Sequence, residues 1–187
     1  SYLDYYMALR RRNPDNFSLD PDDCTRLRDE ATMYYHRYLS LFHLKDFARC
    51  ARDTERNLDC LDFIKKYADD SGDKIAFEQY RPYIIMMNAR SRAYLLLQQG
   101  LRAKALDEVR EGIQRIEAFL HEIGREELIG RSPELNVLRE LEAEIKENLP
   151  SAKIEDLRDE MQRAVADEDF ERAAELRDEI RRIEDLV

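Results

Sequence analysis

Residues Glu160–Glu184, EMQRAVADEDFERAAELRDEIRRIE, decide the fold at the end of the chain, because two apolar ladders flank one acidic turn. Each ladder steps by three or four residues, the spacing of a helix face that packs against a second helix. The turn between them falls at Asp167–Asp169. The spacing predicts a helical hairpin closed by a coiled-coil-like seam. The first ladder is Ile154, Leu157, Met161 and Ala164, and the second is Ala173, Leu176, Ile180, Ile183 and Val187.

The predicted hairpin is short and has an apolar residue at its turn. Each arm is about 16 residues, close to the length at which isolated helices are marginal in water, so a partner would stabilise it. Asp169 can cap the second helix. Phe170 follows it, with Val165 and Ala174 nearby. We expect a partner protein to bind at this turn, although Phe170 could instead fold back on Val165 or on the rest of the chain.

From Leu157 to Glu184 the residues fall without a gap on the pattern of the UVR motif, and residues 151–187 resemble that family. The motif occurs in the excision-repair subunits UvrB and UvrC and in regulators and ATPases of Clp-type protease systems. The resemblance implies a helical hairpin without catalytic groups that pairs with another UVR hairpin or a partner protein. The candidate partner-binding residues are Leu157, Met161, Val165, Asp169, Phe170, Ala173, Ala174, Arg177 and Ile180.

The rest of the chain is predicted to be helical as well, so the fold class is all-α with about eight helices in antiparallel hairpins. Asp20 followed by Pro21 marks the start of a long helix, and Ser132 followed by Pro133 marks a later one. A helix that contains residues 77–99 includes Pro82, which either lies in its first turn or kinks it. The expected helices cover residues 2–12, 21–43, 47–67, 77–99, 101–123 and 132–148, with two more in 151–187.

A weak internal repeat suggests how residues 1–149 are organised. The stretches His43–Ala51, Gln99–Asp107 and Asp167–Glu175 each place a tight turn before a helix with small residues near its start. The first two resemble tetratricopeptide hairpins, although the helices are longer than a repeat of about 34 residues allows. We therefore expect a tetratricopeptide-like domain over 1–149 and a UVR hairpin over 151–187. This domain also resembles other bacterial UVR-motif-containing proteins, a likeness that implies an architecture and no activity.

The charge distribution disfavours direct contact with nucleic acid. The chain has 41 acidic and 31 basic residues, a net charge of −10, and residues 151–187 carry −6 of it, with 13 acidic and 7 basic residues. Nucleic-acid affinity comes mainly from cations that displace counterions from phosphate. We expect protein partners and no direct nucleic-acid binding.

The cysteine count and the apolar runs bear on compartment and membrane contact. Cys24, Cys50 and Cys60 are three in number and lack the Cys-x-x-Cys spacing of a zinc site or redox motif, which favours a reducing, cytoplasmic setting. Apolar runs are far shorter than the roughly 20 residues that span a bilayer, so no membrane contact is expected. Since the sequence begins at Ser1 without methionine, we expect it to be a piece of a longer chain.

No residue pattern predicts an enzyme, a metal site or a cofactor. His36, His43 and Cys50 recur every seven residues, but a connector separates the cysteine from the two histidines; Glu117 and His121 lack the Glu-x-x-His spacing of di-iron bundles. The chain has no phosphate-binding loop GxxxxGK[ST]. An aromatic band could line a peptide groove or simply form helix–helix core. Its members are Tyr34, Tyr35, Tyr38, Phe42, Tyr80 and Tyr83.

These features favour a non-enzymatic adaptor or scaffold that binds a partner through its C-terminal hairpin, without cofactors. Burial of the seam would supply affinity, and the charged flanks would supply register and selectivity. Two alternatives follow from the resemblance: an accessory factor of nucleotide excision repair that recruits UvrB or UvrC, and a regulator of a Clp-type protease. Self-association through the hairpin is a third.

Overall fold

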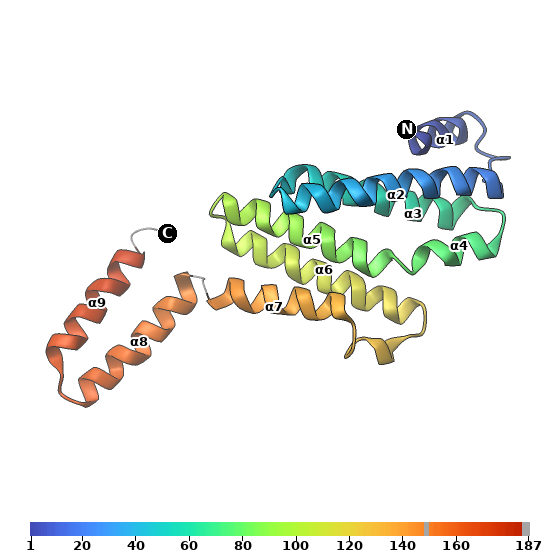
Figure 1. Ribbon diagram of the computed structural model, residues 1–187. Coiled ribbons are helices and arrows are strands. Elements are labelled where there is room, and N and C mark those ends of the chain that lie inside the picture. The colour runs from blue at the N-terminus through green and yellow to red at the C-terminus, as the bar shows by residue number, and fades with distance from the viewer. Residues whose placement is uncertain (148–149, 185–187) are drawn as a thin grey trace. The chain divides into compact units, whose positions relative to one another are not determined.

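The computed structural model describes residues 1–147 and 150–184, and this part of the chain is all-α, as the sequence predicts (Figure 1). An isolated parallel bridge pairs Leu19 with Ala68. The helices are α1 (Tyr2–Arg12), α2 (Pro21–His43), α3 (Phe47–Tyr67), α4 (Ser71–Glu78), α5 (Arg81–Gln98), α6 (Arg102–Glu122), α7 (Pro133–Glu147), α8 (Pro150–Ala166) and α9 (Phe170–Glu184), with a short 3-10 helix at Glu126–Leu128 before α7.

Two helix starts lie where the sequence places them. Asp20 accepts a hydrogen bond from the backbone N–H of Asp23 (2.8 Å) and so caps α2, with Pro21 as the first helical residue. Ser132 does the same for α7, because its hydroxyl accepts from the N–H of Leu135 (3.2 Å). In both cases a side-chain oxygen satisfies a backbone donor that the helix leaves unpaired.

The region after α3 corrects the expected helix count. Where one helix was expected over residues 77–99, the structure has α4 from Ser71 and a separate α5 from Arg81, so the described residues contain nine α-helices rather than about eight. Asp70 caps α4 by accepting from the N–H of Gly72 (3.0 Å). Pro82 lies in the first turn of α5, where its missing N–H costs no helical hydrogen bond.

The contacts divide the chain into two compact units, residues 1–139 and 140–187. This division falls within α7, whereas the boundary expected between 149 and 151 lies partly outside the described residues. In the first unit, α2 pairs with α3, α5 pairs with α6, and α3 packs against α5 (Figure 1). The second unit contains the hairpin α8–α9.

Small residues let the helices of the first unit approach closely. A Cβ atom placed on Gly112 of α6 would lie 2.5 Å from the Cβ of Ala89 on α5, a distance that real Cβ atoms do not reach. Ala105, near the start of α6, is fully buried. Glycine and alanine at these positions therefore set the separation between α5 and α6.

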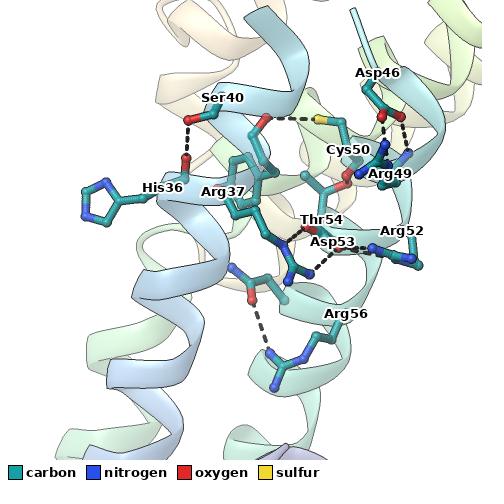
Figure 2. A network of polar contacts seen from close by, with 12 residues as sticks. His36, Arg37, Ser40, Asp46, Arg49, Cys50, Arg52, Asp53, Thr54 and Arg56 are labelled. Carbon is teal, nitrogen blue, oxygen red and sulfur yellow. Dashed lines mark hydrogen bonds and ion pairs between the residues drawn. The ribbon is translucent and has the colours of Figure 1, made fainter. Parts of the chain in front are cut away.

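The turn between α2 and α3 ends one helix and begins the next within three residues. Lys45 adopts a left-handed backbone conformation (φ 58°), and the N–H of Asp46 donates to the carbonyl of Leu41 (2.9 Å). The carboxylate of Asp46 then accepts from the N–H of Arg49 (3.2 Å) and also pairs with its guanidinium (Figure 2). One aspartate thus closes the turn and caps α3.

A polar network lies between α2 and α3 (Figure 2). The buried carboxylate of Asp53 accepts two hydrogen bonds from the guanidinium of Arg37 (2.6 and 2.8 Å) and contacts Arg52 (3.2 Å). Buried Asn57 donates to the carbonyl of Ala31 on α2 (3.0 Å). Because these buried groups are paired, they hold the two helices in register without a large desolvation penalty.

The two hairpins of the first unit agree with the expected helical-hairpin architecture. Their helices have 23, 21, 18 and 21 residues, longer than a repeat of about 34 residues would contain. The tetratricopeptide likeness therefore stays a prediction.

Candidate protein-docking site

The seam of the α8–α9 hairpin forms as the residue spacing predicts. The two helices bury one apolar cluster between them, and its buried members come from both arms. Leu176 is fully buried at its centre. The cluster contains Leu157, Ala164, Ala173, Leu176 and Ile180, with Ile154, Met161 and Ile183 partly buried around it; Val187 lies outside the described residues.

Ion pairs join the two arms on the hairpin surface. Arg172 at the start of α9 pairs with Glu160 of α8 (3.0 Å), and Lys153 pairs with Glu179 (3.3 Å). All four side chains are about half exposed, so each pair contributes little to stability. Their main effect is to favour one register between the arms.

The α8–α9 turn has the same construction as the α2–α3 turn. Glu168 is left-handed (φ 59°), and the N–H of Asp169 donates to the carbonyl of Ala164 (2.9 Å). The carboxylate of Asp169 accepts from the N–H of Arg172 (3.0 Å), so it caps α9 as the sequence predicts. The turn is therefore well defined although it contains no glycine.

Two apolar side chains at this turn face solvent. Phe170 is 66% exposed and Val165 is 50% exposed. Within the hairpin, Phe170 does not join the buried cluster between α8 and α9. Asp167, Glu168 and Glu171, all exposed, lie within three residues of it in the sequence. Exposed apolar side chains flanked by charged residues are typical of a protein-binding surface.

The nine candidate docking residues fall into two groups. Val165, Asp169, Phe170 and Arg177 are exposed, and Ala174 is partly buried. The others lie in or against the seam, so they can support docking only by holding the two helices together. They are Leu157, Met161, Ala173 and Ile180.

Residues 151–186 match the UvrB/uvrC motif (UVR) family, which covers α8, α9 and their turn. No curated protein matches the chain, and no solved structure matches it. The second unit therefore carries a UVR motif, a protein-interaction motif, at the end of an all-α chain.

Residues 1–147 and 150–184 contain no cluster that could hold a metal ion, that is, no group of three or more suitably placed histidine, cysteine, aspartate or glutamate side chains. In that same part of the chain, no helix is long and apolar enough to cross a membrane. His36 is exposed, whereas Cys50 is buried and donates to the carbonyl of Tyr38 (Figure 2).

Part of the aromatic band lines a cavity in the first unit. The cavity has a volume of about 540 Å³, and Tyr35, Tyr38, Tyr80 and Tyr83 contribute to its wall. Burial raises the pKa of Tyr38 and Tyr83, so both phenols are neutral at physiological pH. The band does not form one surface, because Tyr34 and Phe42 lie elsewhere. Tyr34 packs under the guanidinium groups of Arg37 and Arg56, and Phe42 contacts Phe47.

The left-handed conformation of Glu168 was not predicted from the sequence. The equivalence of Phe47 and Phe170 does have a sequence signal, because residues 46–51 read DFARCA and residues 169–174 read DFERAA.

Proposed function

We propose that this chain is a non-enzymatic adaptor that docks a partner protein through the turn of its UVR hairpin. The observation that carries the proposal is the exposure of Phe170 and Val165 beside a hairpin whose own seam is already closed. The seam residues already pack against each other within the hairpin. The apolar surface that another protein can contact is therefore at the turn.

The same proposal includes a cytoplasmic location and the absence of direct nucleic-acid contact. Three free cysteines, all buried, support a reducing compartment. The acidic second unit supports a protein partner over a nucleic acid. The proposal assigns no catalytic group and no cofactor to the docking surface.

A comparative pull-down tests this proposal. The full chain, its Phe170→Glu variant and the control Ile75→Glu would each be immobilised and exposed to lysate of the source organism. Ile75 lies on α4 and is 72% exposed, so its variant adds the same charge to another exposed apolar site. Circular dichroism would verify folding, and light scattering would measure self-association.

Proteins retained by the parent and by Ile75→Glu, but lost from Phe170→Glu, would support docking at the turn. UvrB or UvrC among them would assign the chain to excision repair, and a Clp-type ATPase would assign it to regulated proteolysis. Equal retention by all three chains would refute docking through Phe170.

A further inference from the structure

The turns of α2–α3 and α8–α9 correspond residue by residue, with equivalent positions that differ by 123 in number (169 minus 46). Lys45 and Glu168 share the left-handed conformation, with φ of 58° and 59°. Asp46 and Asp169 both cap the following helix through the N–H three residues later. Structure at one turn therefore indicates how the other can be covered.

In the first unit, helix α5 covers the α2–α3 turn. Phe47 is only 8% exposed, because Tyr94 of α5 stacks on it with ring centroids 5.1 Å apart. The guanidinium of Arg90, four residues earlier on α5, lies 4.7 Å from the ring centroid of Phe42. An arginine and an aromatic residue one helical turn apart thus cover two rings at once.

Two more α5 residues extend this contact along α3. The hydroxyl oxygen of Ser91 lies 2.9 Å from the sulfur of Cys50. The amide of Asn88 donates to the carbonyl of Ala51 and to the hydroxyl of Thr54, both at 3.0 Å. The face that α5 covers therefore consists of five positions: Phe42, Phe47, Cys50, Ala51 and Thr54.

The equivalent five positions of the UVR hairpin all belong to the candidate docking site. Phe42 corresponds to Val165 and Phe47 to Phe170, the two exposed apolar residues at the turn. Arg177, at the position of Thr54, is also exposed. Ala173, at the position of Cys50, is buried in the seam. We call the other four residues the uncovered face: Val165, Phe170, Ala174 and Arg177.

Charge indicates the chemistry of the helix that fits this face. Helix α5 contains three arginines and no acidic residue. Residues 44–48 at the covered turn have one lysine and one aspartate, whereas residues 167–171 have four carboxylates and no cation. The UVR turn therefore favours a basic helix more strongly than the covered turn does.

We propose that the uncovered face binds a basic α-helix of another protein, one that presents an arginine, a small residue and an aromatic residue in the arrangement of Arg90, Ser91 and Tyr94. The inference rests on the proposed docking function and names the partner's chemistry. A second copy of this chain fits poorly, because its hairpin carries the same −6 charge and its α5 is engaged in its own first unit.

A peptide titration against the full chain tests the proposal. The probe is an 18-residue fluorescent peptide that keeps Asn88, Arg90, Ser91 and Tyr94 of α5 and has alanine, glutamine or lysine elsewhere. A control peptide has the same composition, with the arginine and the tyrosine moved to opposite helix faces. Fluorescence anisotropy at low salt measures binding.

The probe is expected to bind more tightly than the control peptide, and Phe170→Ala is expected to weaken its binding by about tenfold. Glu168→Lys should weaken it by about threefold, and less so as salt increases. A lysine is compatible with the backbone at position 168, because Lys45 adopts the same left-handed conformation at the equivalent position.

Absence of probe binding, equal binding of the two peptides, or an unchanged affinity in Phe170→Ala would each overturn the basic-helix assignment. If the pull-down still loses proteins from Phe170→Glu in that case, docking at the turn stands and the partner has another chemistry, such as a second UVR hairpin. If both experiments fail, the docking function itself fails.

Discussion

Asp53 in the α2–α3 hairpin and Leu176 in the α8–α9 hairpin occupy equivalent positions, and both are buried. Asp53 can be an aspartate because Arg37 of the facing helix satisfies its carboxylate. Leu176 instead lies in an apolar cluster that has five buried side chains among the described residues, Leu176 included. The same backbone framework therefore closes with a polar network in one hairpin and with aliphatic packing in the other.

The comparison extends to what surrounds each hairpin. Helices α2, α4 and α5 of the first unit all pack against α3, whereas the UVR hairpin buries a small core between two helices. A small core gives little surplus stability. The difference teaches that hairpins with the same turn can differ in how much helix packing their own unit provides.

The largest expected effect is on the rate of thiol labelling. All three cysteines are buried, and all lie in the first unit. Burial raises the pKa of Cys60 to about 12 and that of Cys24 to about 11. Labelling by a thiol reagent at pH 8 should therefore be slower than in the urea-unfolded chain by on the order of a thousandfold. The measurement is the rate of reaction with and without urea.

The same thiols predict an alkaline loss of stability in the first unit. The folded pKa values lie above the unfolded value of about 8.5, so the stabilisation is fully present below that pH and is lost as the pH rises toward 12. Urea titrations at pH 8 and pH 10 would measure this loss, and equal stability at the two pH values would contradict it.

In the labelling experiment, a reaction of the folded chain as rapid as that of the unfolded chain would contradict the burial of the three cysteines.

Leu176→Ala should unfold the UVR hairpin while the first unit stays folded. The loss of a fully buried leucine costs about 3 kcal/mol, a large fraction of what a two-helix core can supply. Amide hydrogen exchange, read separately over α9 and α3, is the measurement. The matched variant Ile64→Ala removes a fully buried side chain from α3 and should leave exchange in α9 unchanged. Retained protection of α9 in Leu176→Ala would show that the hairpin does not depend on its seam.

Several features of the fold follow from local sequence. The seam of Leu157, Leu176 and Ile180 was predictable, because helical periodicity alone brings such residues to one face. The start of α2 followed from Asp20 and Pro21. In these cases every interacting residue lies within one helix or one short hairpin.

Other features depend on contacts between distant residues. Tyr94 covers Phe47 from a position 47 residues away (94 minus 47), and Asp53 finds its partner on the preceding helix. Neither pairing has a local signature in the sequence. The exposure of Phe170 was also open, since a phenylalanine at a turn is buried or exposed according to whether a further helix reaches it.

Asp53→Ala should destabilise the first unit by about 2 kcal/mol. The variant removes both hydrogen bonds to Arg37, but the arginine is half exposed and can be hydrated, so the cost stays below that of breaking a fully buried pair. Urea denaturation followed by thiol labelling reports on the first unit alone. An effect below 0.5 kcal/mol, within about the range of surface substitutions, would mean that Asp53 does not hold α2 and α3 together.

Glycine at the left-handed turn positions should have the smallest effect, and it should be favourable. Lys45→Gly and Glu168→Gly each relieve a backbone conformation that side chains disfavour, which stabilises the corresponding hairpin by about 0.5–1 kcal/mol. Gly100 already occupies the equivalent position before α6 (φ 76°). Thermal melts of both variants are the measurement. Destabilisation by either glycine would contradict the shared turn geometry.

Photocrosslinking from the turn tests the central claim most directly. Phe170→p-benzoylphenylalanine would be irradiated in lysate of the source organism, and Leu44→p-benzoylphenylalanine, at the covered turn and 73% exposed, would serve as the control. We predict adducts of position 170 with one or a few other proteins, and none above background from position 44. Absence of adducts from position 170, or the same adducts from both positions, would contradict the assignment of the UVR turn as the docking site.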